Sequence, residues 1–561
     1  MLDTLELFLL FLLTLALLAR LLGLWLLPLA QGRAPACVAT ADRWLLKAFG
    51  LKPDAQEGWR DYALSVLLFH VLAFVFLTAV LLAQGHLPGN PAGLAGVPLV
   101  TALHTAASFV SGTAWQAYAP ETTLSLLSQA IGIGVAEFVS TASCIAVAFV
   151  VMRGFALSAT NVLGNFWVDL LRILIWVLFP LCTLYAVFLL VMGVPQAWLG
   201  PVEVVSAAGR EVTQLIGPVA SSEAVKTIGT IGAGLFGANS AHPVANPSAG
   251  VNFAASVGML LIPVALTHTF GKLTGDPKEG RSLRWAMWLL FALALFSFVH
   301  DEISAGNFLS QYGIDARGFM TEGKDSRFGL AHTALFTVTS IASGTGAVNN
   351  LLDTLAPGAG MVLILLMLTG GVFESSGAGF CSVSVYIVLA VFVAGLMIGR
   401  APEYLGKRIG VSTIKLAASA MLVIPVVALT GLIVTLLSPI AQEAVANPGA
   451  HGYTEILYAW ASVASNNGSA MGGLDTSSPF FEIGLGLAMI AGRVGLLGFL
   501  LALAGDVGLE RRSPHTKGAL VTNGPLFAVF LAFVILLFGA LTYLPLMALG
   551  SAAEQLEYFV L

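Results

Sequence analysis

Ser111-Gly112-Thr113-Ala114 is the first of four short, polar, glycine-containing stretches that recur at near-equal intervals along this chain. The others are Thr230-Ile231-Gly232-Ala233-Gly234, Ser343-Gly344-Thr345-Gly346 and Ser465-Asn466-Asn467-Gly468-Ser469. Each follows an apolar segment that is too short to cross a bilayer and precedes one that is long enough. This order predicts a re-entrant pore loop between two membrane helices, repeated four times. We call the four stretches the first to fourth loops.

The composition places the chain among integral membrane proteins. Hydrophobic residues make up 57% of its 561 residues and charged residues only 10%, which is more apolar surface than a soluble fold can bury. The formal net charge of -5 leaves no basic stripe and excludes a nucleic-acid-binding function. The four cysteines lie far apart, which argues against a disulfide framework and a CxxC metal site.

Apolar runs of about twenty residues predict about ten membrane spans. They are 5–27, 64–82, 131–151, 173–192, 251–270, 285–299 with its flanks, 361–397, 416–437, 483–503 and 526–549. Four runs of roughly half that length precede the loops and are expected to form pore helices. They are 101–110, 221–229, 328–342 and 454–464. The order is one lone span, four units of span, pore helix, loop and span, and a final lone span.

The predicted fold is therefore an all-α integral membrane fold with four membrane-pore loop-membrane repeats, which is potassium-channel-like and pseudo-fourfold. The repeat has a period of roughly 115 to 120 residues. We divide the chain into an extra N-terminal transmembrane helix with a basic cytoplasmic loop (1–60), four pore repeats (61–153, 165–272, 280–400 and 412–506) and a C-terminal transmembrane helix (520–561). The third repeat contains a broken helix.

Basic residues are distributed unequally between the two sides of this scheme. The connections on one side hold seventeen lysines and arginines, whereas those on the side of the four loops hold five. The positive-inside rule therefore places both termini and all four loops outside the cytoplasm. The run 5–27 is as long as a full span and lacks an A-x-A-like cleavage site, so we expect it to be retained as a helix.

The loops have the composition of a filter for monovalent cations. Small hydroxyl, Asn and Gly residues allow backbone carbonyls to converge on an axis, where a ring of oxygens can replace the hydration shell of an ion. The C-terminal end of each pore helix adds a partial negative charge that favours a cation. Small residues also serve close helix packing, but four stretches in register favour the filter. The predicted ion-binding residues are Ser111, Gly112, Thr113, Thr230, Ile231, Gly232, Gly344, Thr345, Gly346, Asn466, Asn467 and Gly468.

The run 361–397 is too long for one crossing, and its middle, from Gly370 to Gly379, is a poor helix. Unwound backbone at membrane depth is tolerated only where it is buried in protein or lines a wet cavity. We therefore expect a helix that is broken beneath the third loop and that gates or redirects the ion. The alternative is a kinked structural helix. The predicted gate residues here are Gly370, Gly371, Glu374, Gly377 and Gly379.

Ionisable residues inside spans are functional candidates. Arg493 follows the fourth loop and is expected to tune ion occupancy or to neutralise a neighbouring acid. Glu137 is expected either to face the cavity or to pair with Arg493. His70 and His268 are interpreted as helix-packing residues.

Several motifs outside the loops resemble those of the potassium-binding A subunit (KdpA) family of the bacterial Kdp potassium-transporting P-type ATPase. The most specific is Gly399-Arg400-Ala401-Pro402-Glu403-Tyr404-Leu405-Gly406-Lys407, because nothing in an ordinary membrane helix requires this string. Others are Trp115-Gln116, Ala238-Asn239-Ser240-Ala241-His242-Pro243 and Glu322-Gly323-Lys324-Asp325-Ser326-Arg327. The resemblance covers nearly the whole chain, and Gln116 and Arg400, which lie in these motifs, are further candidate pore or gate residues.

The resemblance implies a channel-like subunit of the superfamily of potassium transporters, with potassium as the bound and transported ion. It implies as partners a P-type ATPase catalytic subunit (KdpB-like) and small single-span subunits (KdpC-like and KdpF-like) in the bacterial inner membrane. The second loop departs from the family pattern, because Ile231 and Ala233 stand where the family usually has Asn and Gly.

The chain itself carries no sequence for ATP chemistry. It has neither a G-x-x-x-x-G-K-[ST] loop nor an Asp-Lys-Thr-Gly phosphorylation sequence. We therefore expect no catalytic site and no nucleotide here, with ATP hydrolysis on another polypeptide. The alternative is a stand-alone channel-like potassium or sodium transporter of the Trk, Ktr or HKT type. A membrane-embedded enzyme would need clustered His, Asp and Glu at catalytic spacing, which the sequence does not offer.

Overall fold

The computed structural model describes residues 2–205, 209–314, 318–370, 372–374, 376–513 and 520–560, with the side chains of 440–442 and 557–560 left out. The predicted gate residue Gly371 lies outside these residues, as does Ser375 in the run from Gly370 to Gly379. Arg317 and Lys517, two of the basic residues counted for the topology, also lie outside them.

The described part of the chain contains ten helical stretches that are long and apolar enough to cross a membrane, so the protein is a multi-pass membrane protein. This confirms the predicted number of spans. Their helices are α1 (Leu2–Ala30), α3 (Trp59–Ala83), α6 (Gly134–Ala156), α7 (Phe166–Ile173) with α8 (Phe179–Val191), α10 (Ala249–Leu273), α11 (Pro277–Gln311), α14 (Ala378–Ile398), α15 (Val411–Leu436), α18 (Pro479–Leu509) and α19 (Pro525–Met547). Short π-helical turns over Ser128–Ile133 and Leu174–Leu178 extend α6 and join α7 to α8.

Four shorter helices stand where pore helices are predicted. They are α4 (Leu99–Ser111), α9 (Val219–Gly229), α12 (Gly329–Ala342) and α17 (Ala450–Ala464), and each ends at one of the four loops. Along the chain, the order of span, pore helix and span occurs four times, flanked by α1 and α19. The predicted all-α fold class is therefore confirmed. α1 packs along α10 and α19 packs against α11, so the two lone spans cover the outside of the repeats.

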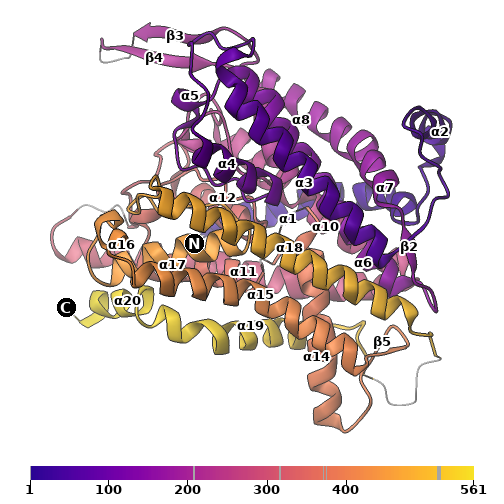
Figure 1. Cartoon of the computed structure of the whole chain (residues 1–561). Coiled ribbons are helices and arrows are strands. Elements are labelled where there is room, and N and C mark those ends of the chain that lie inside the picture. Colours follow the sequence, from indigo (N-terminus) through magenta and orange to yellow (C-terminus); the bar gives the residue numbers. More distant parts are fainter. Residues whose placement is uncertain are drawn as a thin grey trace.

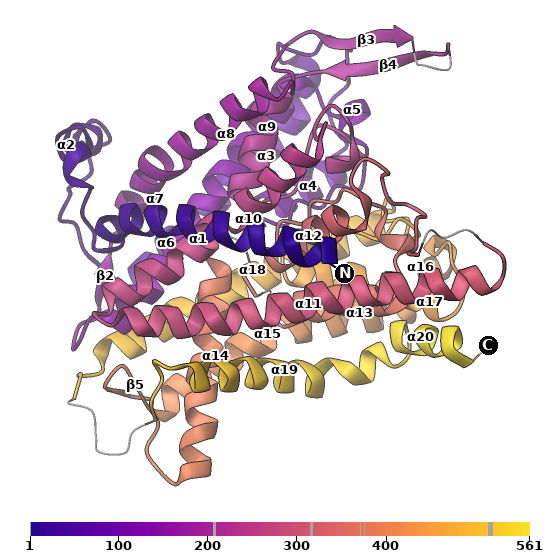
Figure 2. The same ribbon diagram turned by 180° about the vertical axis from the view of Figure 1, so that it is seen from behind.

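Smaller elements gather at the two ends of the spans (Figures 1 and 2). Both termini, α16 (Pro439–Ala444) and α20 (Ser551–Val560) lie toward one end. At the opposite end lie α2 (Ala39–Ala48) and two small pairs, β1 (Glu57–Gly58) with β2 (Val162–Gly164) and β5 (Glu403–Tyr404) with β6 (Lys407–Arg408). The remaining helices are α5 (Pro120–Thr123) and α13 (Pro357–Leu368).

An antiparallel hairpin, β3 (Gly200–Val205) with β4 (Glu211–Ile216), projects from the helical body (Figure 1). The sequence analysis did not predict it, because a two-stranded ribbon with one partly buried face gives a weak period-2 signal beside long apolar helices.

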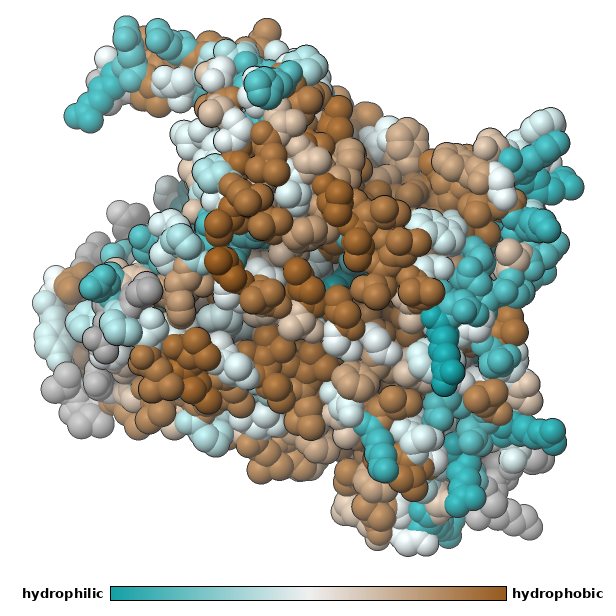
Figure 3. Space-filling view, viewed as in Figure 1, coloured by the Kyte–Doolittle hydropathy of each residue, from teal (hydrophilic) through white to brown (hydrophobic). Residues whose placement is uncertain are grey.

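The surface around the spans is apolar. Figure 3 shows a broad hydrophobic surface over α3 and α18 and hydrophilic residues at the end that carries α2 and β5. Large side chains such as Leu64, Leu68 and Val75 on α3 are at least half exposed, which suits contact with lipid and not with water.

A buried guanidinium joins three segments at the end near β2. All five donors of Arg153 on α6 are used: Nη1 and Nη2 bind the carboxylate of Asp169 at 2.6 and 2.8 Å, and the remaining bonds go to the carbonyls of Leu29, Ala30 and Leu163. Arg153 thereby caps the C-terminal end of α1 and fixes the start of α7 against α6.

Candidate functional site

The four loops share one backbone turn. Each loop contains a residue with a left-handed backbone close to the end of its pore helix. Directly after the helix stand Gly112 (φ 78°) and Thr230 (φ 55°), and one residue further along stand Gly344 (φ 63°) and Asn466 (φ 56°). The amide of the next residue then donates back to the helix, over 2.8 Å from Thr113 to Ser108, 3.2 Å from Ile231 to Lys226, 2.9 Å from Thr345 to Ser340 and 2.8 Å from Asn467 to Ser462. Four segments that are far apart in sequence therefore leave their pore helices through the same local turn.

Thr230 is the unusual member of this set. A β-branched residue rarely adopts a left-handed backbone, because its side chain crowds the following carbonyl. The Thr230 hydroxyl donates to the Gly229 carbonyl over 2.6 Å, and its oxygen accepts from the Ser376 amide over 2.8 Å. These bonds hold the strained conformation in place.

The loops touch one another in chain order and close a ring, which we call the loop ring. A Cβ added at Gly232 would collide with the Thr345 carbonyl, one at Gly346 with the Asn467 carbonyl, and one at Gly468 with the Thr113 carbonyl. The second loop thus abuts the third, the third abuts the fourth, and the fourth abuts the first.

The ring closes between the first and second loops, where a Cβ added at Gly112 would lie 3.8 Å from the Ile231 side chain. Glycine is required at Gly232, Gly346 and Gly468 because a neighbouring backbone occupies the space of a side chain.

Several side chains of the loop ring are held by hydrogen bonds. The Ser111 and Thr113 hydroxyls are 2.7 Å apart, and the Ser343 and Thr345 hydroxyls repeat the same contact at 2.7 Å. Asn466 donates to the Thr113 hydroxyl over 2.9 Å, and Asn467 donates to the Ile341 carbonyl over 3.1 Å. These bonds stiffen the loops and leave main-chain oxygens as the groups available to an ion.

The second loop has a support that the sequence analysis did not single out. Asn239, itself left-handed at φ 53°, donates from Nδ2 to the Gly232 carbonyl over 2.8 Å. Its Oδ1 accepts from the Val348 amide, which follows the third loop, over 3.4 Å. Asn239 therefore fixes the second loop against the third. Its place in the motif 238–243 was the signal that could have identified it.

The predicted break in the third repeat is present. α13 ends at Leu368 and α14 begins at Ala378, and Gly370 (φ 81°) and Gly377 (φ 144°) adopt conformations that favour glycine. The intervening segment reaches two loops, because Ser376 binds Thr230 and the Phe373 amide donates to the Ala342 carbonyl over 2.9 Å. We call the described residues between α13 and α14 (369, 370, 372–374, 376 and 377) the break segment.

Glu374 in the break segment is buried and accepts from the Ser382 hydroxyl over 3.3 Å. A Cβ at Gly379 would collide with the backbone of Glu374, and one at Gly377 with the Cys144 carbonyl of α6. The break segment is therefore packed in protein on both sides, as unwound backbone at membrane depth requires.

Arg493 on α18 lies beside the first loop. It is buried, donates to the Cys144 sulfur, and its Nη2 would lie 3.8 Å from a Cβ added at Gly112. The role predicted for Arg493 in neutralising a neighbouring acid stays a prediction. Among the described residues, the alternative of a Glu137–Arg493 pair is not formed, because Glu137 Oε1 and Arg493 Nε have no hydrogen-bond partner there. His70 Nδ1 donates to the Val66 carbonyl of its own helix over 2.8 Å, as a helix-packing residue would.

Two of the predicted pore or gate residues, Gln116 and Arg400, lie outside the loop ring. Gln116 lines a cavity of about 590 Å³ beside the first and fourth loops, which also presents the exposed carboxylates of Glu443 and Asp475. Arg400 is exposed beyond the far end of α14, roughly 30 Å along that helix from the break segment. The structure thus brings together the loop residues, the break segment and Arg493, but not Arg400.

The chain matches one protein family over nearly its whole length. Residues 9–556 match the family described as potassium-transporting ATPase A subunit (KdpA). The chain is similar to the potassium-transporting ATPase potassium-binding subunits of Edwardsiella ictaluri (45% identity, covering 98% of this chain and 97% of the relative) and Methylibium petroleiphilum (45% identity, 97% of each).

In fold, the chain is similar to the crystal structure of the potassium transporter TrkH from Vibrio parahaemolyticus. The TM-score is 0.51 at 15% identity, over 76% of this chain and 82% of that one.

Proposed function

The chain belongs to the family of potassium-transporting ATPase A subunits, and from this premise we propose that its loop ring selects potassium for an ATP-driven uptake pump. The ion enters from the outer side and binds main-chain oxygens around Gly112 or Thr113, Gly232, Gly346 and Gly468. The break segment beneath the ring then controls its passage to a partner subunit.

The closed contact of the four loops is the observation that carries this proposal. Three of the four junctions press one loop against the backbone of another, and the Ile231 side chain fills the fourth, so the loops support one another's positions. Such a preformed cage can replace the hydration water of a cation of fixed size without collapsing around a smaller one. The C-terminal ends of α4, α9, α12 and α17 add partial negative charge at the ring.

The orientation that we propose places both termini and the loop ring outside the cytoplasm of a bacterial inner membrane. The seventeen to five excess of basic residues on the opposite side supports it. The cavity beside Gln116 then opens outward, where its carboxylates would attract cations toward the loop ring.

We propose that ATP is hydrolysed by a KdpB-like P-type ATPase subunit, accompanied by small KdpC-like and KdpF-like subunits. This chain has no phosphorylation or nucleotide-binding sequence, so the energy for uptake must come from a partner. For the four pore repeats we propose the boundaries predicted from the sequence, which are 61–153, 165–272, 280–400 and 412–506.

The proposal is tested by coupling between the loop ring and ATP hydrolysis. In the assembled complex, Gly468→Val should raise the potassium concentration that half-stimulates ATP hydrolysis, because the added side chain displaces the Thr113 carbonyl. ATPase activity is measured against potassium concentration. Gly498→Ala, at a helical glycine whose added Cβ meets nothing within 4 Å, is the matched control.

Unchanged stimulation in a variant that has lost ion binding would refute coupling through this subunit. Copurification of the chain without any ATPase subunit would instead favour a stand-alone transporter of the Trk, Ktr or HKT type.

A second expected result concerns the break segment. Gly377→Leu should lower the transport rate on the order of tenfold while ion binding changes little, because the loop ring forms above this segment. Rubidium uptake and rubidium binding are measured on the same preparation. Gly360→Ala on α13, where the nearest atom to an added Cβ is the Met471 methyl group at 3.6 Å, is the control. Equal losses of binding and transport would contradict a separate gate.

A further inference from the structure

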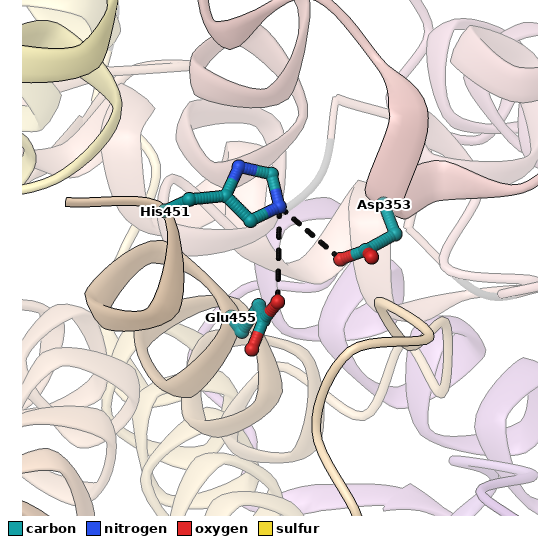
Figure 4. Close-up of side chains that lie close together, drawn as sticks. All are labelled: Asp353, His451 and Glu455. Carbon is teal, nitrogen blue, oxygen red and sulfur yellow. Dashed lines mark hydrogen bonds and ion pairs between the residues drawn. The ribbon is translucent and has the colours of Figure 1, made fainter. Parts of the chain in front are cut away.

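Asp353, His451, Glu455 and Glu554 meet at the end of the molecule that carries α16 and α20, away from the loop ring's contacts. Asp353 belongs to a 3-10 turn (Leu352–Thr354) after the third loop, His451 and Glu455 lie one turn apart on α17, and Glu554 lies on α20. Figure 4 shows His451 pointing between the carboxylates of Asp353 and Glu455.

The distances suit a small divalent cation. His451 Nε2 lies 3.3 Å from Asp353 Oδ1 and 3.7 Å from Glu455 Oε1, and one ligand atom from each residue falls within a group no wider than 4.8 Å. A tetrahedral ion with ligands about 2.0–2.1 Å away separates those ligands by roughly 3.3 Å. The two distances from His451 Nε2 are therefore within a few tenths of an ångström of those around a zinc-sized ion.

The fourth member of the cluster orients the histidine. His451 Nδ1 lies 2.8 Å from Glu554 Oε1, so the ring can donate from Nδ1 to this carboxylate. Its Nε2 lone pair is then directed at Asp353 and Glu455. A carboxylate behind the second nitrogen is the usual support of a metal-binding histidine.

A second observation is that one oxygen of the Glu455 carboxylate is unsatisfied among the described residues. The Glu455 side chain is 0% exposed, and its Oε2 has no hydrogen-bond partner within the described part of the chain. Its Oε1 accepts from the Asn447 amide over 2.6 Å. Burying a carboxylate with one oxygen unsatisfied is costly, and a bound cation would remove that cost.

The cluster is also accessible from outside. The His451 side chain is 22% exposed, and Asn447, which donates to Glu455, lines a neighbouring cleft of about 370 Å³. We propose that Asp353, His451 and Glu455 bind a divalent transition-metal cation of the zinc class, with Glu554 as the positioning residue for His451. Such an ion would tie the fourth pore helix to the third repeat and to α20.

Cobalt(II) is the probe for this site, because tetrahedral coordination gives it intense visible absorption. The full chain, with the subunits that accompany it and freed of metal by chelation, should bind one equivalent of Co²⁺ that Zn²⁺ displaces. His451→Gln and Glu455→Gln should weaken binding at least 100-fold, and Glu554→Gln by about 10- to 100-fold. His86→Gln, at an exposed histidine outside the cluster, should bind as the wild type does.

Potassium binding by each variant checks that it is folded. Absence of a tetrahedral Co²⁺ spectrum in the wild type, or equal binding by folded His451→Gln and Glu455→Gln variants, would overturn the proposal.

Discussion

Replacing Gly232 by aspartate should reduce the preference for potassium over sodium at least tenfold, which corresponds to about 1.4 kcal/mol. A Cβ at this position would overlap the Thr345 carbonyl and the Ala347 amide of the adjoining chain segment, so the second and third loops must separate. The Gly232 carbonyl, held by Asn239, would turn with the loop. A wider, less regular ring discriminates poorly between ions of different radius.

The measurement is a titration of ion binding with rubidium or potassium in competition with sodium on the assembled complex. Gly498→Ala should leave both affinities unchanged, since an added Cβ there meets nothing. Asn239→Ala offers a milder test of the same idea, because it releases the Gly232 carbonyl without adding volume. Unchanged affinity and selectivity in Gly232→Asp would refute the four-loop filter.

Replacing Arg153 by methionine should lower the free energy of unfolding by about 3–5 kcal/mol. The substitution keeps most of the volume but leaves the buried Asp169 carboxylate without its cation, while the carbonyls of Leu29, Ala30 and Leu163 lose their donor. The Tyr62 hydroxyl, 3.2 Å from Asp169, is the remaining partner among the described residues. Denaturant titration in detergent micelles measures the loss.

The matched control is Arg511→Met, which removes an exposed arginine at the same end and should change stability by less than about 1 kcal/mol. The double variant Arg153→Met with Asp169→Leu should recover part of the lost stability, because no unpaired buried charge remains. A loss below about 1 kcal/mol for Arg153→Met alone would mean that water or lipid headgroups already solvate this pair.

Much of the architecture follows from the sequence alone. The ten spans and four pore helices were predictable because a segment inside a bilayer must be apolar and helical. An apolar run is visible in the residues of that one segment, without knowledge of the rest of the fold. The break at Gly370–Gly379 was predictable for the same reason: a glycine-rich stretch is conspicuous inside an apolar run. The family motif from Gly399 to Lys407 added the identity of the complex, because that string is specific.

The tertiary structure decided which residues meet. The loop ring depends on backbone contacts between segments more than a hundred residues apart, and no local pattern tells that Gly232 abuts Thr345 or that Asn239 holds the Gly232 carbonyl. The sequence allowed Glu137 to pair with Arg493, but in the folded chain Arg493 donates to the Cys144 sulfur and Glu137 Oε1 has no hydrogen-bond partner among the described residues. It offered no cluster of His, Asp and Glu, yet folding brings Asp353 to His451 across 98 residues. The hydropathy of a segment can be read from its own residues. A contact between two segments depends on how the whole chain folds.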